Sequence, residues 1–576
     1  MENVEFARLL AETADLMEIA GEDGFRIRSY RNAATALEGH PERVEDILKD
    51  TGRNVTEIPG IGKGIATALH EIQQRGSFER RDQMLEKYPP TALDLLKIQG
   101  LGPKSIALLF EHFRCTTIDD LEKLCQEQKL RSLPRMGAKL EEKVLRSIAA
   151  YRRSAGRFTL NFASSLAQEL KLYLAENTEA GRMEPAGSLR RGRETVGDLD
   201  LLVTCAEPNK VLDRFLHHPK VVEVLAHGEN KASAKVGMEG LQVDVRALPT
   251  ESFGAALQYF TGSKTHNVAL RQRALKLGLT LNEYGLFRLE DNHRAAGETE
   301  EDIYGKLGLP WIPPELRENQ GELEAAEQAR LPKLVELGDI RGDLHMHTTE
   351  TDGRATLEEM AAVARQMGYQ YIAITDHSKS LAMANGLDEA RVTAFASRVR
   401  EINQSGLGIR VLSGLECDIH RDGSMDIADD ALAELDLVIA SVHSHMNLDS
   451  SEMTERLLRA IANRHVKILG HPTGRILLHR DGYPFDFERV AAEAARRGVA
   501  FEINASPERL DLSGPMIRAA KAKGAGFTIS TDAHHPKHLA NMIYGVLTAR
   551  RGWLERSDVL NTLDGEKLLN AFHSAH

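Results

Sequence analysis

Three aspartates in the middle of the chain have the spacing of a metal site. Asp198 and Asp200 lie two residues apart beside an apolar run (199–203), and a β-strand of this sequence would place both carboxylates on one face. Asp244 lies between two valines in a second apolar run, which we expect to form a neighbouring strand. Three carboxylates grouped in this way can bind two divalent metal ions, which suits phosphoryl or nucleotidyl transfer.

A phosphate-binding turn is indicated just before these aspartates by the sequence GSLRRG (187–192). Ser188 offers a hydroxyl, and the two arginines offer forked donors that match phosphate oxygens. A GDLD string such as 197–200 is by itself often only a turn that enters a strand. The ordered series GSLRRG, GDLD and VDV is far less common and favours a nucleotide site.

A second group of polar residues lies in the C-terminal part of the chain, where imidazoles and carboxylates repeatedly end apolar β-type runs. Helical patterns such as 357–367 separate these runs, so the sequence predicts an α/β (TIM-like) barrel with its site at the carboxyl ends of the strands. A single histidine there would more often be an ordinary core residue. Nine such residues favour a cluster of zinc, manganese or iron ions. They are His345, His347, Asp352, His377, Glu416, His443, His471, Asp532 and His534.

The N-terminal part of the chain is predicted to be helical, with glycine turns typical of helix-hairpin-helix motifs. One such turn is usually only a helix end. Repetition at about forty-residue spacing favours contact with DNA backbones, because amides at the start of the following helix can bind phosphate. The residues expected to make these contacts are Gly60, Gly62, Lys63, Gly100, Gly102 and Lys104, and a weaker third copy lies at 133–139.

Length and composition describe an ordinary globular protein of several domains. At one domain per ~150 residues, 576 residues predict about four domains. The net charge of −12 argues against bulk electrostatic binding of nucleic acid, but basic residues dominate between Lys129 and Arg157, which indicates a DNA contact or a solvated helix face. Four cysteines without a CxxC pair indicate no disulfide framework or zinc ribbon. No apolar run could span a bilayer and no signal is evident, so we expect a cytoplasmic, nucleoid-associated protein.

The central motifs resemble those of family X DNA polymerases, the gap-filling group that includes polymerase beta. The series GSLRRG, GDLD and VDV is followed by YFTGS at 259–263. The resemblance implies catalytic and metal-binding roles for Asp198, Asp200 and Asp244, with two Mg²⁺ or Mn²⁺ ions. It implies nucleotide binding by Ser188, Arg191, Gly197, Tyr259, Phe260, Gly262, Asn267 and Arg271.

Three positions depart from the family pattern. Ala68 occupies the position of the lysine that forms a Schiff base in the animal repair members, so we expect no lyase activity by that route, although Lys63 lies nearby. Lys264 stands where polymerase beta has an acid, and Gln242 where it has an arginine. These two changes leave fidelity and primer alignment open.

The C-terminal motifs, in the order HMH, DG, TDH, Glu, His, GHP and TDAHH, resemble the PHP superfamily of metal phosphoesterases. The resemblance implies that the nine residues named above bind about three ions, Zn²⁺ and/or Mn²⁺, which activate a hydroxide nucleophile. None of the nine is missing, so we expect an active nuclease or phosphatase. Arg475 is interpreted either as a contact to the substrate phosphate or as a solvated loop residue.

A palm followed by a C-terminal PHP domain is the arrangement of bacterial family X polymerases. It implies gap filling in base excision repair joined to 3'-5' exonuclease or 3'-end-processing activity, by a monomer that binds gapped or nicked double-stranded DNA and dNTPs. The expected fold class is multidomain α/β, with a helical helix-hairpin-helix region, a palm with a mixed sheet and a PHP barrel. The expected segments are an N-terminal helical domain (1–80), a second helical domain (81–157), the nucleotidyltransferase palm (158–250), a nucleotide-binding subdomain (251–315), a solvated linker (316–340) and the PHP domain (341–576).

Other functions stay open on the sequence. The palm could bind DNA without polymerising, which would leave a PHP nuclease or phosphatase, or the whole chain could be a non-catalytic scaffold for repair partners. A small-molecule histidinol phosphatase is less favoured, because that chemistry needs no repeated hairpins aimed at DNA.

Overall fold

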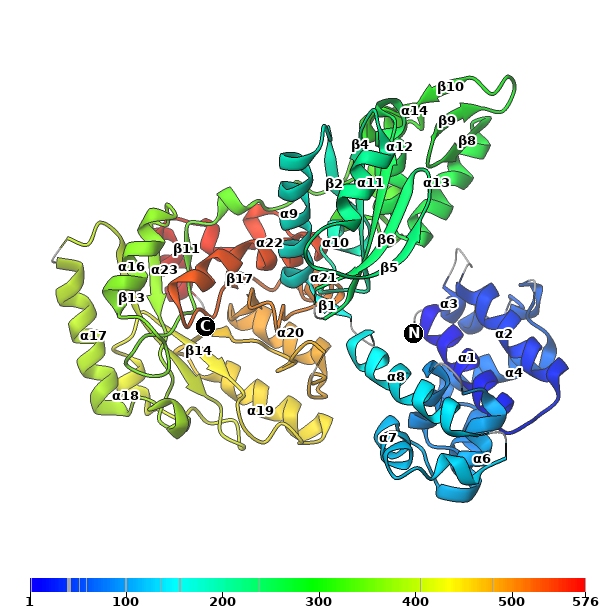
Figure 1. Ribbon diagram of the computed structural model, residues 1–576. Coiled ribbons are helices and arrows are strands. Elements are labelled where there is room, and N and C mark those ends of the chain that lie inside the picture. Colours follow the sequence, from blue (N-terminus) through cyan, green and yellow to red (C-terminus); the bar gives the residue numbers. More distant parts are fainter. Residues whose placement is uncertain are drawn as a thin grey trace. The chain divides into compact units, whose positions relative to one another are not determined.

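The computed structural model describes residues 1–574 except 2, 39–42, 51, 59, 99–100, 135, 155–156, 238, 405 and 479. It forms two compact units, 1–156 and 157–576 (Figure 1). No helix in this described part is both long enough and apolar enough to span a bilayer.

The first unit is helical. Its apolar side chains recur at helical spacing and pack into two clusters, one around Phe6 and Leu69 and the other around Leu95 and Leu109. Its helices are α1 (Asn3–Ile19), α2 (Gly24–Glu38), α3 (Val44–Lys49), α4 (Lys63–Arg75), α5 (Glu79–Lys87), α6 (Pro103–Phe113), α7 (Ile118–Gln126) and α8 (Ala138–Ser154).

The two stronger hairpin turns each lead from a 3₁₀ segment into an α-helix. The segments η1 (Val55–Glu57) and η2 (Pro90–Lys97) precede the turns, and Gly62 and Gly102 cap the helices α4 and α6 that follow. Gly60 has a φ of 95°, in the left-handed region that favours glycine.

The palm is built on a five-stranded sheet with the order β2-β4-β7-β6-β5. Helix α9 (Leu160–Asn177) covers it with apolar residues spaced three and four apart. Strands β4 and β7 are parallel, and the other pairs are antiparallel, which gives the predicted mixed sheet. The strands are β2 (Met183–Pro185), β4 (Asp198–Thr204), β5 (Val221–His227), β6 (Lys231–Val236) and β7 (Leu241–Leu248), and the short pair β1 (Phe158–Thr159) and β3 (Thr195–Val196) lies outside this sheet.

The segment after the palm carries a buried network of charges. Arg317 and Glu322 are fully buried, whereas we expected a solvated linker from residue 316. Arg317 pairs with Glu300 at 2.6 Å, and Glu322 pairs with His266 at 2.6 Å, because a buried charge needs such a partner. The elements here are α12 (Phe253–Thr261), α13 (Lys264–Lys276), β8 (Leu279–Asn282), β9 (Gly285–Arg288), β10 (Arg294–Ala296), α14 (Glu300–Lys306) and α15 (Glu322–Glu327).

The C-terminal part, hereafter the barrel (341–576), has seven parallel strands in sequential order from β11 to β17. The strands are almost continuously apolar because both of their faces are buried. A parallel bridge between Met346 and Ala533 joins the segments that follow the two outer strands. The barrel is therefore nearly closed, with seven strands among its described residues where a TIM barrel has eight. The strands are β11 (Gly342–Asp343), β12 (Tyr371–Ile374), β13 (Arg410–Asp418), β14 (Leu437–Ser441), β15 (Val466–Leu469), β16 (Ala500–Asn504) and β17 (Phe527–Ser530).

Helices follow most of the barrel strands along the chain (Figure 1). They are α16 (Leu357–Gln366), α17 (Glu389–Gln404), α18 (Asp429–Leu432), α19 (Ser450–Ala462), α20 (Phe487–Arg497), α21 (Gly514–Ala522), α22 (Met542–Arg551) and α23 (Gly565–Ser574).

Candidate active sites

The three palm aspartates come together because of the register between two strands. Asp200 on β4 lies directly opposite Asp244 on β7, and Asp198 lies on the same face of β4 as Asp200. Asp198 is exposed, whereas Asp244 is 6% exposed. Three carboxylates on one sheet face, one of them open to solvent, offer the oxygen ligands that magnesium and manganese prefer.

Two cations beside these carboxylates were not predicted. The Nζ of Lys231 lies 2.6 Å from Oδ2 of Asp244, and the Nε of Arg246 lies 3.5 Å from Oδ1 of Asp200. Burial raises the pKa of Asp200 to about 6 against the opposing charge of Arg246. Arg246 lies two residues after Asp244, so strand alternation could have indicated it, but Lys231 is positioned by the register of β6.

The predicted phosphate-binding turn forms the short helix α10 (Gly187–Arg190). A phosphate ligand would be expected to face open space, but Arg190 does not. Its guanidinium donates two hydrogen bonds of 2.8 Å to Glu300. Arg191 donates to the carbonyl of Thr261 at 2.6 Å and to Glu318 at 3.1 Å. The turn is therefore held by arginines that contact protein acceptors, and no sequence pattern indicated partners seventy or more residues away.

The YFTGS motif ends helix α12 and begins the turn into α13. Asn267 donates to the carbonyl of Tyr259 at 2.6 Å. A Cβ on Gly262 would lie 2.0 Å from Oδ1 of Asn267, so a larger residue there would displace the side chain of Asn267 from its bond to Tyr259. Arg271 is exposed one helical turn farther on, and Phe260 lies under the guanidinium of Arg246 at 4.1 Å.

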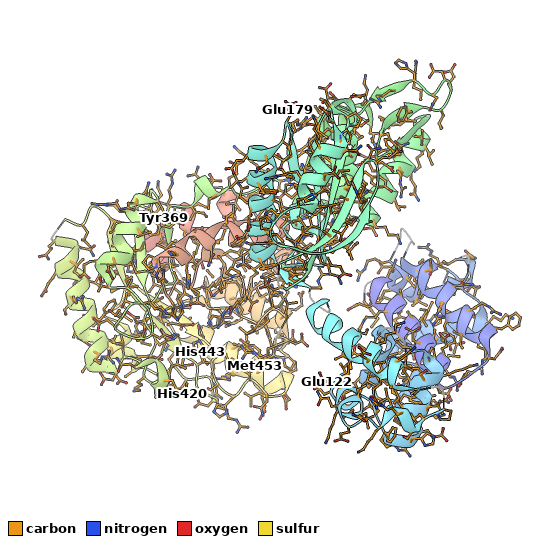
Figure 2. The ribbon with its side chains drawn as sticks, viewed as in Figure 1. Glu122, Glu179, Tyr369, His420, His443 and Met453 are labelled. Carbon is orange, nitrogen blue, oxygen red and sulfur yellow. The ribbon has the colours of Figure 1, made fainter. Side chains whose placement is uncertain are left out.

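The nine predicted barrel residues converge at the carboxyl ends of the strands. Glu416 contacts five imidazoles, and the shortest distances are 2.8 Å to His377 and 2.8 Å to His471. The sixth imidazole, that of His534, lies 3.5 Å from Asp352 and 3.8 Å from Asp532. Figure 2 marks one of these imidazoles, His443, just beyond β14. Three overlapping subsets have the geometry of metal ligands: His347, Asp352, His377 and His534; His345, His347 and Asp532; and His377, Glu416 and His443.

The electrostatics of this cluster fit bound cations. Nε2 of His345 and Nδ1 of His347 are buried and lack a hydrogen-bond partner among the described residues, as expected of nitrogens that would bind a metal ion. Burial opposes the charge of His377, but Glu416 and Asp352 outweigh it and raise the pKa of that imidazole to about 10. Burial, helped by the neighbouring His377, lowers the pKa of His347 to about 3. The carboxylates thus hold positive charge in a buried site, which metal ions can supply.

A second layer of acids that we did not predict orients these imidazoles. Glu502 accepts from Nδ1 of His345 at 2.6 Å and from the backbone N–H of His471 at 2.6 Å, and Asp418 lies 3.0 Å from Nδ1 of His443. Such partners fix the tautomer of a metal-binding histidine. Glu502 lies inside β16 and Asp418 ends β13, each among apolar residues. Such positions indicate a role only once the strand ends are known to face a metal cluster.

The residues predicted to contact DNA lie at the two hairpin turns. Lys63 and Lys104 are exposed in the first turn of α4 and α6, and Gly60, Gly62 and Gly102 lie in the turns themselves, whereas Gly100 lies outside the described residues. Ala68 is buried on α4.

Arg475 in the barrel donates to the carbonyls of Arg509 and Leu510, so it is not a solvated loop residue.

Four family models match parts of the chain. They describe a helix-hairpin-helix domain (residues 1–78), a SAM-like helix-hairpin-helix tandem (92–150), a DNA polymerase beta thumb (256–318) and a PHP domain (343–506). With the nearly closed parallel barrel, these matches confirm the predicted fold class.

The chain is similar over almost its whole length to one curated protein. It is 37% identical over 562 residues, 97% of each chain, to the DNA polymerase/3'-5' exonuclease PolX of Bacillus subtilis (strain 168). The chain is also similar over a shorter stretch to probable phosphatases. One from Shewanella sp. (strain ANA-3) is 33% identical over 202 residues, which cover 33% of this chain and 75% of that protein. Another, from Thermoanaerobacter sp. (strain X514), is 28% identical over 231 residues, which cover 38% of this chain and 89% of that protein.

Proposed function

This chain belongs to the PolX family of DNA polymerase/3'-5' exonucleases, and we propose that the palm carboxylates and the barrel cluster are the separate active sites of its two activities. The observation that carries this proposal is the presence of two groups of possible metal ligands in one chain. Carboxylates share one face of the palm sheet around Asp200, and imidazoles and carboxylates converge around Glu416. Both activities depend on divalent metal ions.

In the palm, Asp198, Asp200 and Asp244 would hold two Mg²⁺ or Mn²⁺ ions. Such ions, when bound, lower the pKa of a primer 3'-hydroxyl and neutralise the triphosphate. The chain itself orients the nucleotide. Ser188 and Gly197 would face the phosphates, and Arg191 would support their turn through its bonds to Thr261 and Glu318. The segment from Tyr259 and Phe260 through Gly262 to Asn267 and Arg271 would face the sugar and base.

In the barrel, the nine residues would hold about three ions, Zn²⁺ and/or Mn²⁺, which matches their mixture of imidazole and carboxylate donors. Such ions, when bound, lower the pKa of water and polarise a phosphodiester. Glu502 would keep Nδ1 of His345 protonated, so that its Nε2 faces the cluster. The resulting reaction is removal of nucleotides or of blocking groups from a DNA 3'-end.

The substrates of both sites are DNA and, for the palm, dNTPs. We propose that the hairpin turns around Lys63 and Lys104 bind the backbone of gapped or nicked DNA, and that the protein acts as a monomer at the nucleoid in base excision repair. Because Ala68 carries no amine, the proposal includes no lyase step through that position.

The proposal is tested with a labelled primer on gapped DNA in manganese, with and without dNTPs. We expect Asp198→Ala to abolish incorporation and keep 3'-end hydrolysis, and His345→Ala to do the reverse. Glu207→Ala, an exposed palm carboxylate, is the matched control. Incorporation that survives in Asp198→Ala would instead favour a nuclease or phosphatase whose palm only binds DNA.

A further inference from the structure

A barrel residue contacts the phosphate-binding turn of the palm. Arg551, the last residue of α22, is 7% exposed. Its Nη1 donates to the backbone carbonyl of Arg191 at 3.0 Å and to Oε1 of Glu318 at 3.1 Å. One buried nitrogen therefore joins three parts of the chain that are far apart in sequence.

One of the two acceptors of Arg551, Glu318, also contacts the side chain of Arg191. Arg191 donates through its own Nε to the same oxygen of Glu318 at 3.1 Å, and through Nη1 to the carbonyl of Thr261 at 2.6 Å. Arg551 thus holds both the backbone of Arg191 and the carboxylate that orients its guanidinium. Arg191 lies three residues after Ser188 in the turn at 187–192.

The contact is part of a close-packed surface between palm and barrel. A Cβ on Gly192 would lie 3.3 Å from Cβ of Leu547 on α22, and Gly192 has a φ of 64°. Leu510 of the barrel is fully buried within the palm core. Glu194 lies 3.7 Å from Arg475 of the barrel. The turn therefore rests on the barrel and is not free to adjust alone.

We propose that Arg551 is a positioning residue for the polymerase reaction, which holds the turn at 187–192 in the shape that binds the phosphates of the incoming nucleotide. The inference rests on the proposed function of the palm. It gives the barrel a second role that is independent of its metal cluster, since Arg551 is not among the nine cluster residues. Without Arg551 the carbonyl of Arg191 loses its donor and Glu318 loses one of its cations. The turn would then spend less time in its binding shape, and the apparent nucleotide affinity would fall in proportion.

The test compares full-length Arg551→Ala and Arg551→Lys with the wild type on gapped DNA. Loss of these hydrogen bonds in Arg551→Ala should raise the KM for dNTP about three- to tenfold, with kcat and 3'-end hydrolysis little changed. Arg551→Lys should recover part of the loss, because both bonds come from a single nitrogen that an ammonium group can replace. If Arg551→Ala does not fold, Arg551→Gln takes its place in the same comparison.

Arg550 provides the matched control on the neighbouring position of α22. Its side chain binds Glu315 at 2.6 Å and the carbonyl of Val335 at 3.2 Å, so it supports the same surface without contacting the turn. Arg550→Ala should leave the KM for dNTP unchanged. An unchanged KM in Arg551→Ala, or an equal rise in both alanine variants, would overturn the inference. Both results are distinct from failure of the proposed function, in which the wild type itself would not incorporate nucleotides or Asp198→Ala would incorporate them normally.

Discussion

The palm site and the barrel site differ in how the protein balances charge before any metal arrives. In the palm, two of the three carboxylates lie beside cations of the chain itself, Asp244 beside Lys231 and Asp200 beside Arg246. In the barrel, carboxylates lie among imidazoles, and Glu416 alone contacts five of them. Asp200 and Asp244 therefore have positive charge of the chain beside them, whereas in the barrel the buried nitrogens Nε2 of His345 and Nδ1 of His347 lack a hydrogen-bond partner among the described residues.

This difference indicates two ways of using metal ions. Asp198, the first residue of β4, is exposed and Asp200 is half-buried, so ions can enter the palm site with each nucleotide. The barrel ligands come from the ends of several strands and most are buried, with His345 and His347 fully inaccessible. A buried, imidazole-rich site favours resident transition-metal ions. We therefore expect the barrel to retain its metals through purification and the palm to take its metals from solution.

The largest effect is expected from Glu416→Ala, which removes the carboxylate at the centre of the barrel cluster. The remaining imidazoles would lose their shared anion, and 3'-end hydrolysis should fall by more than about 10²-fold. Elemental analysis of the purified protein should show loss of bound metal, while incorporation by the palm continues.

Glu401→Ala is the matched control, because Glu401 is exposed on α17 of the same barrel. It should keep both its metal content and its hydrolysis. Full metal content and normal hydrolysis in Glu416→Ala would contradict the view that the barrel is a resident-metal site.

The sequence predicted the fold class and chose residues that lie together, because short motifs carry both the strand pattern and the ligands. What it did not predict depends on long-range register and packing. Lys231 reaches Asp244 only through the pairing of β6 with β7, and Arg190 meets Glu300 across 110 residues. Glu502 looks like any polar residue in an apolar run. The charged stretch after residue 316 was expected to be solvated, but Arg317 is buried against Glu300, the first residue of α14, a partner that the sequence did not indicate.

A smaller effect is expected from Glu502→Gln. This substitution changes the acid that contacts Nδ1 of His345 and leaves the nine cluster residues intact. Glutamine keeps the shape but loses the charge that holds Nδ1–H of His345. Metal affinity or hydrolysis should fall about 10- to 100-fold, measured by competition with a chelator. Asp436→Asn is the control, since its carboxylate accepts from Ser413 instead. Equal losses in the two variants would point to general destabilisation and would weaken the claim that second-layer charge sets metal affinity.

The smallest effect, and the most direct test of the palm half of the comparison, is expected from Lys231→Met. The ammonium of Lys231 lies 2.6 Å from Oδ2 of Asp244 and is 39% exposed, so it competes with a metal ion for that oxygen with the modest strength of a partly solvated pair. Its removal should lower the magnesium concentration for half-maximal incorporation by up to about fivefold. Lys210→Met is the control, because Lys210 pairs with the exposed Glu207. A higher magnesium requirement in Lys231→Met would mean that Lys231 helps to bind the nucleotide or the DNA more than it competes with the metal ion. The proposed difference between the two sites, in which cations of the chain compete with metal ions only in the palm, would then be wrong.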